Sequence, residues 1–261
     1  MEPIRGVLLD LDGVFYVGED AVPGAADALA ALRAADLRTL LLTNTTSRPR
    51  TALLEKLDRL GVPAQAEDLL TPAVAAGDWI RAQGAEPVAT FFAEATAVDL
   101  GAVERLPEAA ESGAGAVVLG DLGDRWDFAT LNRAFRLLMT PERPPLLALG
   151  MTRYWRAPDG LRLDASPFVR ALEHAADVEA VVLGKPSSEF FAAALARIGC
   201  SAGETLMVGD DVRTDVGGAQ AAGLRGALVR TGKFAPSDLE GAVTPDAVLD
   251  SLADLPAWLG L

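Results

Sequence analysis

Short apolar runs alternate with amphipathic stretches along the chain. The apolar runs are rich in Leu and Val, as is typical of buried strands. The stretches between them carry apolar residues at helical spacing, and several open with Ser, Thr or Asp, which cap helix N-termini. This alternation predicts parallel strands joined by helices that cover both faces of a sheet.

The predicted elements follow from the places where these patterns start and stop. Strands are predicted at 7–9, 37–42, 88–92, 116–119, 146–149, 180–183, 205–208 and 227–229. Helices are predicted at 25–35, from a Ser47 cap to Gly61, from Thr71 to about Gln83, at 127–139, 166–176, 188–198 and 214–222, and around Trp258. The expected fold class is therefore α/β, with a doubly wound parallel sheet.

Several apolar runs end directly in residues that could bind a ligand. LLDLDG carries Asp10 and Asp12, LLLTNTT carries Thr43 and Asn44, AVVLGKP carries Lys185, and LMVGDD carries Asp210. In open α/β sheets, ligands bind beyond the carboxyl ends of the strands. The sequence therefore predicts that these side chains meet in one crevice.

Composition narrows the chemistry of that crevice. The 261 residues include 23 basic and 37 acidic side chains, a net charge of −14. Such a surface repels nucleic acid and anionic lipid, so neither is an expected partner. One Cys and one His exclude an intrachain disulfide and multi-histidine metal sites, so a metal would be a hard cation held by oxygen. No long apolar run resembles a signal peptide or membrane span, so a cytoplasmic location is expected.

The first two motifs each have a structural alternative. Asp10 and Asp12, two acids separated by one residue, suit a nucleophile and an acid/base, but D-x-D-G is also turn chemistry. Thr43 and Asn44 could hold phosphoryl oxygens or simply form the turn before the next helix.

The later motifs are similarly ambiguous when taken alone. Lys185 lies between a strand and a serine-capped helix, so it is expected to be fixed in place rather than solvated. Asp210 follows a strand directly. Asp211 and Asp215 could support the site or only complement a helix N-terminus.

Other reactive or aromatic residues have simpler interpretations. Cys200, at a helix end, is expected to pack, and His174 to be partly exposed structure. Tyr154 and Trp155 could line a substrate pocket, but packing is the simpler expectation. The glycines of GAGAVVLG precede their strand, whereas a dinucleotide-binding fingerprint follows one.

The order of the motifs is more specific than any one of them. D-x-D-G-V, T-N, G-K-P and G-D-D-x-x-x-D resemble the four signature motifs of the haloacid dehalogenase superfamily, and the resemblance runs nearly end to end. It is closest to subclass IIA, the NagD-like proteins with a large inserted cap. TNTTS, VVLGKPSSEFF, GDDVRTDVGGAQAAG and VRTGKFAPSD are similar to the phospholysine phosphohistidine inorganic pyrophosphate phosphatase branch.

This resemblance implies a domain organisation. A Rossmann-like core would comprise residues 1–76 and 182–261, and an α/β cap would comprise residues 77–181. Arg153, Tyr154, Trp155 and Arg156 would lie in the region that selects the substrate. Subclass relatives often dimerise through the cap, so a homodimer is an expected assembly.

The resemblance also implies a mechanism that the residues are chemically able to perform. Asp10 would attack phosphorus and Asp12 would act as general acid and then base. Mg²⁺ would be held by Asp10, the Asp12 backbone carbonyl and Asp210. Thr43, Asn44 and Lys185 would bind the phosphoryl group, with Lys185 also neutralising Asp10. Asp215 would steer Lys185 or a metal-bound water, a role that Asp211 could share.

The expected partner is a small phosphorylated compound: phospholysine, phosphohistidine, pyrophosphate or a small phosphometabolite. One alternative is a hydrolase that displaces halide from carbon, but that reaction needs neither a second acid nor Mg²⁺, so Asp12 and Asp210 argue against it. The other is a phosphate-binding or regulatory protein with little turnover.

Overall fold

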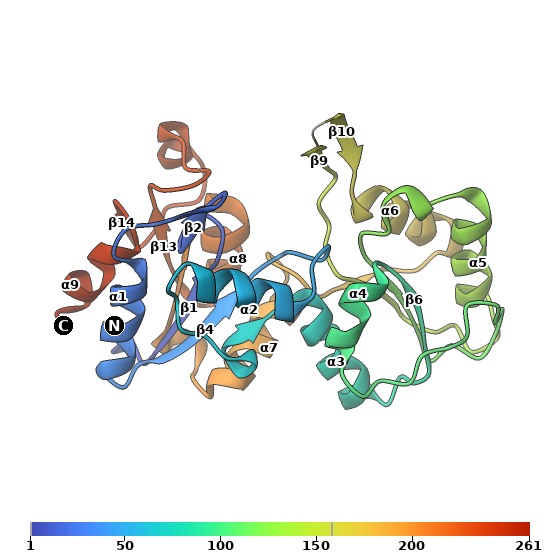
Figure 1. Cartoon of the computed structure of the whole chain (residues 1–261). Coiled ribbons are helices and arrows are strands. Elements are labelled where there is room, and N and C mark those ends of the chain that lie inside the picture. Colours follow the sequence, from blue (N-terminus) through green and yellow to red (C-terminus); the bar gives the residue numbers. More distant parts are fainter. Residues whose placement is uncertain (1, 158) are drawn as a thin grey trace. The chain divides into compact units, whose positions relative to one another are not determined.

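In the computed structural model, which describes residues 2–157 and 159–261, the chain divides into two compact units (Figure 1). The first contains the chain up to Thr43, Thr51–Leu70 and Lys185–Leu261. The second contains Asn44–Arg50 and Thr71–Gly184, so it is inserted within the first along the sequence. The segment predicted as a cap, residues 77–181, falls inside this second unit, and its function as a cap stays a prediction.

The first unit is built on a six-stranded sheet in the order β14-β13-β12-β1-β4-β5. Every neighbouring pair is parallel. The strands are β1 (Gly6–Asp10), β4 (Arg38–Leu42), β5 (Leu69–Leu70), β12 (Thr205–Gly209), β13 (Arg225–Val229) and β14 (Ala247–Leu249). The chain starts in the middle of the sheet and extends it to both sides, which confirms the doubly wound α/β fold.

The central strand β1 is buried along its whole length. Val7 and Leu9 belong to a core cluster with Leu29 and Leu32 of α1 (Ala25–Ala34), whereas Leu8, between them, does not. This alternation is expected for a strand whose two faces are both covered. The other helices of this unit are α2 (Arg50–Arg59), α7 (Ser188–Ile198), α8 (Gly218–Ala221) and α9 (Leu255–Leu259).

Two predicted helix starts were wrong. Helix α2 begins at Arg50 rather than after a Ser47 cap, and the Arg50 N–H donates to Asp99 Oδ2 at 2.7 Å. A carboxylate distant in sequence thus satisfies a first-turn donor. The helix predicted at 214–222 begins earlier, with a π-helical segment at Val212–Gly217 before α8, because the Asp211 carboxylate accepts hydrogen bonds at its start.

The second unit has its own parallel sheet in the order β11-β8-β7-β6. The strands are β6 (Val88–Phe91), β7 (Ala116–Leu119), β8 (Leu146–Ala148) and β11 (Val181–Val182). The helices are α3 (Pro72–Gln83), α4 (Glu94–Ala97), α5 (Phe128–Leu138) and α6 (Ala165–Ala176). Apolar residues from β6, β7 and β8 pack with α5 and α6 in a separate core.

The alternation pattern missed two short hairpins. One joins β2 (Tyr16–Val17) to β3 (Asp20–Ala21), and the other joins β9 (Tyr154–Ala157) to β10 (Gly160–Leu163). The packing expectation for Tyr154 and Trp155 was wrong, since they are 51% and 42% exposed. Two-stranded hairpins have little core to bury against, so their apolar residues stay accessible.

Within residues 2–157 and 159–261, no helix has the length and apolar character needed to cross a bilayer.

Candidate active site

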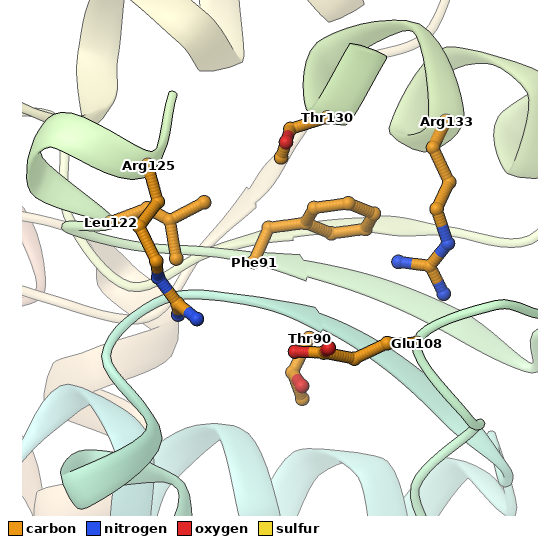
Figure 2. Close-up of a pocket in the computed structure, with 7 residues that line it drawn as sticks. All are labelled: Thr90, Phe91, Glu108, Leu122, Arg125, Thr130 and Arg133. Atoms are coloured by element: carbon orange, nitrogen blue, oxygen red, sulfur yellow. The ribbon is translucent and has the colours of Figure 1, made fainter. Parts of the chain in front are cut away.

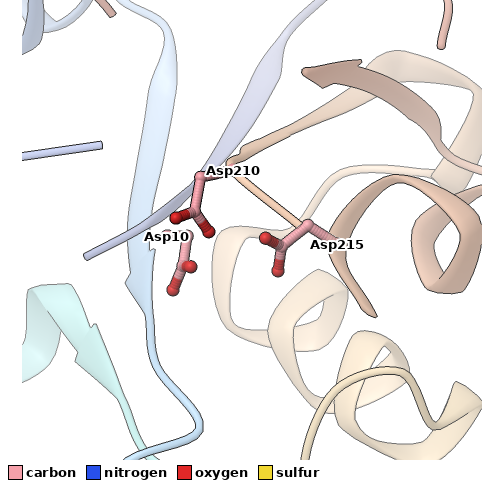
Figure 3. Close-up of side chains that lie close together, drawn as sticks. All are labelled: Asp10, Asp210 and Asp215. Atoms are coloured by element: carbon pink, nitrogen blue, oxygen red, sulfur yellow. The ribbon is translucent and has the colours of Figure 1, made fainter. Parts of the chain in front are cut away.

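Three carboxylates and one ammonium group meet in the first unit (Figure 3 shows the carboxylates). Lys185 Nζ lies 2.6 Å from Asp10 Oδ1 and 2.7 Å from Asp215 Oδ1. Asp10, Asp210 and Asp215 each offer a carboxylate oxygen within 4.8 Å of the others. All four residues are buried. Asp10, Lys185 and Asp210, which are far apart in the sequence, therefore lie together, whereas a shared crevice with Asp12, Thr43 and Asn44 stays a prediction.

The fold fixes these side chains through the elements that carry them. Asp10 is the last residue of β1, and Asp210 directly follows the neighbouring strand β12. Lys185 precedes α7, which starts at a Ser187 cap whose hydroxyl accepts from the Phe190 N–H at 3.2 Å. Adjacent parallel strands end at the same edge of a sheet, which is why these charges meet.

Burial and neighbouring charges have opposing effects on the pKa values of the ion-paired groups. Burial raises the pKa of Asp10 above its ordinary value, although the Lys185 ammonium opposes this. Burial and the charge of Asp10 likewise raise the pKa of Asp215 to about 6, against the effect of Lys185. Burial alone would lower the pKa of Lys185, but the two carboxylates outweigh it and hold that pKa above the ordinary lysine value. Lys185 is therefore a permanent cation at neutral pH.

Among the residues that the structure describes, no donor faces one of the two Asp210 carboxylate oxygens. Its Oδ2 accepts from the Lys233 N–H at 2.8 Å, whereas its Oδ1 is buried and has no hydrogen-bond partner among the described residues. Burial raises the pKa of this carboxyl group as well. A buried carboxylate oxygen without a partner is costly unless a cation or a proton satisfies it.

The cluster fits a divalent cation. In the ionised state three carboxylates outnumber the cations that act on them, Lys185 and Lys233, so the cluster keeps an excess of negative charge. Carboxylate oxygens are the ligands that Mg²⁺ prefers. Both oxygens of Asp215 already face donors, Lys185 Nζ and the Asp211 N–H at 3.1 Å. Asp10 and Asp210 are therefore the better candidates for ligands, and Asp215 for orienting Lys185.

The structure separates the roles of Asp211 and Asp215. Asp211 Oδ1 accepts from the Arg213 and Thr214 N–H groups, both at 3.0 Å. Burial opposes ionisation, but the hydrogen bonds from Thr214 and Arg213, together with the charge of Lys233, outweigh it and lower the pKa of Asp211. Asp215, not Asp211, contacts Lys185 among the described residues. The N-terminal capping alternative thus accounts for the contacts of Asp211.

The other predicted residues, Asp12, Thr43 and Asn44, closely follow β1 and β4 in the sequence. Asp12 is exposed, and its Oδ2 accepts from the Tyr16 hydroxyl at 3.3 Å. Thr43 is buried immediately after β4, and its N–H donates to Leu70 O at 3.3 Å. Asn44 belongs to the second unit, so its part in phosphate binding stays a prediction.

One contributing segment was not assigned a role from the sequence. The Thr231 hydroxyl donates to the Gly13 carbonyl, and the Lys233 N–H holds Asp210. Gly232, between them, has a φ of 68°, and a Cβ there would overlap the Asp210 carboxylate. The stretch VRTGKFAPSD was informative only as a family resemblance, since a strand-end turn of this kind has no chemical signature of its own.

A cavity of about 250 Å³ in the second unit contains none of these residues. Phe91 lies at its centre with Arg125 and Arg133 to either side, and Thr90, Glu108, Leu122 and Thr130 complete the lining (Figure 2). The Arg133 guanidinium carbon lies 5.0 Å from the Phe91 ring centroid. None of the strand-end residues predicted from the sequence lines this cavity, so the candidate active site is the carboxylate cluster.

Comparison with known proteins agrees with this geometry. The haloacid dehalogenase-like hydrolase family matches residues 7–104, and an HAD-hydrolase-like family matches residues 182–255. Human phospholysine phosphohistidine inorganic pyrophosphate phosphatase is 38% identical over 96% of this chain and 92% of its own length. The chain belongs to the haloacid dehalogenase-like hydrolase family. Within it, this enzyme groups with phosphatases, as the branch resemblance predicts.

Solved structures support the same grouping. A p-nitrophenyl phosphatase from Archaeoglobus fulgidus superposes with a TM-score of 0.87 at 25% identity, covering 98% of this hydrolase and 100% of the other chain. NagD from E. coli K-12 gives a TM-score of 0.82 at 24% identity, covering 97% and 98% of the two chains, and shows the shared fold. The predicted NagD-like resemblance is confirmed.

Proposed function

We propose that this hydrolase is a Mg²⁺-dependent phosphatase that forms an aspartyl phosphate on Asp10. The observation that supports this most directly is the buried contact of Lys185 with Asp10, beside the unpartnered Oδ1 of Asp210. A phosphoryl group that approaches Asp10 needs positive charge in its path, because a carboxylate and a phosphate repel each other. Lys185 supplies that charge from a fixed position.

The residues divide the reaction between them. The Asp10 carboxylate attacks phosphorus in line while Lys185 neutralises both the attacking group and the phosphoryl oxygens. Asp12 donates a proton to the leaving oxygen and then takes one from the water that hydrolyses the aspartyl phosphate. Thr43 and Asn44 hold phosphoryl oxygens, and Asp215 keeps Lys185 directed at Asp10.

Asp10, the Asp12 backbone carbonyl and Asp210 would hold Mg²⁺. When bound, Mg²⁺ screens the anionic groups that must meet and stabilises charge on the phosphoryl oxygens. The unpartnered carboxylate oxygen of Asp210 and the charge imbalance of the cluster both support this ligand set.

The substrate class follows from the relatives. Because the human relative is named for phospholysine, phosphohistidine and inorganic pyrophosphate, we propose one of these, or another small phosphorylated metabolite. The inserted unit would act as the cap that selects the leaving group. Tyr154 and Trp155 lie in the exposed β9–β10 hairpin of that unit and Arg153 directly precedes it, whereas the side chain of Arg156 lies outside the described residues. Dimerisation through the cap remains a prediction.

Removal of the metal tests the proposed function. Hydrolysis of p-nitrophenyl phosphate should fall to background in EDTA and return with excess Mg²⁺, because Asp10 and the phosphate would otherwise repel each other without screening. A parallel assay with Ca²⁺ in place of Mg²⁺ tests whether activity requires the smaller cation, Mg²⁺. Full activity in EDTA would contradict the proposal. Binding of phosphate without turnover of any compound in a broad phosphate panel would favour the regulatory alternative.

Asp12→Asn should slow both half-reactions, each by roughly 10²–10⁴-fold, because an amide can neither give nor take the proton. Rapid-quench measurement with a ³²P-labelled substrate resolves formation and decay of the phosphoenzyme. Normal labelling followed by normal hydrolysis would remove Asp12 from the acid/base role.

A further inference from the structure

A buried lysine lies outside the four motifs. Lys56, on α2, is 6% exposed, and its Nζ donates to the Gly18 carbonyl at 2.7 Å. The same atom lies 3.8 Å from the centroid of the Tyr16 ring. Its ion pair with Glu19, at 3.3 Å, involves a carboxylate that is 76% exposed. A buried ammonium group needs compensation, and here the aromatic ring and the Gly18 carbonyl supply most of it away from solvent.

Tyr16 connects this lysine to the first motif. It is 2% exposed, and its hydroxyl donates to Asp12 Oδ2 at 3.3 Å. Its carbonyl accepts from the Gly13 N–H at 2.7 Å. The same residue therefore holds the turn after β1 through its backbone and the Asp12 carboxylate through its side chain.

This arrangement restrains the side chain of Asp12. A cation over an aromatic face withdraws electron density from the ring, which makes the phenol a better donor. A hydrogen bond to an ionised carboxylate is stronger than one to a neutral carboxyl group. The Tyr16 hydroxyl therefore holds the Asp12 carboxylate in one orientation, and a proton-transfer group that is held in a fixed geometry increases the rate.

We propose that Tyr16 is the positioning residue of the general acid/base Asp12, and that Lys56 fixes and polarises its ring. This inference rests on the proposed function. As the bond from Asp10 to phosphorus forms, the bond to the leaving oxygen breaks with its electron pair on that oxygen. The Asp12 proton moves to the same oxygen, while Tyr16 keeps its own proton.

Tyr16→Phe tests the inference, since it removes the hydroxyl and keeps the ring beneath Lys56. Values of kcat/KM are compared for p-nitrophenyl phosphate and phenyl phosphate at saturating Mg²⁺. Phenol is the poorer leaving group and depends more on a proton from Asp12. We expect the ratio of kcat/KM for phenyl phosphate to kcat/KM for p-nitrophenyl phosphate to fall about fivefold in Tyr16→Phe, through the loss of one hydrogen bond of ordinary strength.

Two further variants separate positioning from general destabilisation. Lys56→Met should lower the same ratio by a smaller factor, whereas Glu19→Gln should leave it unchanged, because the Glu19 carboxylate is largely in solvent. Thermal unfolding measures any loss of stability in each variant. Tyr16→Phe alone tests whether Tyr16 positions Asp12, even if Lys56→Met is unstable. An unchanged ratio, or an equal loss for both substrates, overturns the inference. Failure of the wild type to hydrolyse either ester with Mg²⁺ would instead contradict the proposed function.

Discussion

Asp10→Asn lowers kcat by roughly 10⁴-fold or more in the mechanism proposed here, because an amide cannot form the acyl phosphate and only binding and electrostatic effects remain. The substitution is nearly isosteric, and it removes a charge from a site that carries more carboxylates than cations. The fold should therefore be retained, with a thermal midpoint at or above that of the wild type in EDTA. Steady-state hydrolysis of p-nitrophenyl phosphate and acid-quenched ³²P labelling measure the loss.

A matched control makes the same chemical change at the surface. Asp27→Asn, in the first turn of α1, replaces an exposed carboxylate and should leave kcat unchanged. Wild-type turnover in Asp10→Asn, or a stable phosphoenzyme on a different residue, would remove Asp10 from the role of nucleophile.

Lys185→Met should reduce both activity and stability. It leaves the Asp10 and Asp215 carboxylates buried without their shared cation. Removal of one partner from a buried ion pair typically costs about 3–5 kcal/mol of folding free energy. Because the pKa of Lys185 is raised in the folded protein, its stabilisation is present below the ordinary lysine pKa of 10.5 and is lost at higher pH. Urea unfolding in EDTA at neutral pH measures the difference without a contribution from bound metal.

The pH dependence of the variant gives a second check on Lys185→Met. Without the ammonium group, the two carboxylates are stabilised by protonation, so the variant should regain stability as the pH falls from 7 towards 5. The double variant Lys185→Met/Asp215→Asn should recover part of the lost stability but none of the activity, since the charge on Asp10 is still not neutralised. Equal stability of Lys185→Met and the wild type would contradict the view that this ion pair is buried and strong.

Sequence reasoning singled out three members of the buried cluster, Asp10, Lys185 and Asp210, because they stand at the ends of strongly apolar runs. Asp10 and Asp210 follow β1 and β12, which are apolar enough to be read as buried strands, and parallel strands end at a common edge. Lys185 stands out for the same reason, between a strand and a well-capped helix. Thr231 and Tyr16 were not singled out from the sequence, because a hydroxyl in a turn or a short hairpin carries no periodic signal.

The errors have a related cause. Ser47 has the sequence features of a cap, but Asp99 supplies the carboxylate that accepts the first-turn N–H of α2. The exposed aromatic residues of the β9–β10 hairpin were expected to pack because apolar residues usually do. Both outcomes depend on contacts between residues far apart in the sequence, which local propensity does not contain.

By itself the sequence determined the α/β class, the order of the four motifs and a crevice chemistry based on carboxylates and a lysine. Local periodicity carries that information, since burial of a strand or a helix face requires it. Only the tertiary structure decided that Asp215 rather than Asp211 faces Lys185 and that Lys56 lies over Tyr16. It also showed that one oxygen of Asp210 has no partner within residues 2–157 and 159–261. Each of these depends on distances of a few ångströms between atoms that the chain brings together only when it folds.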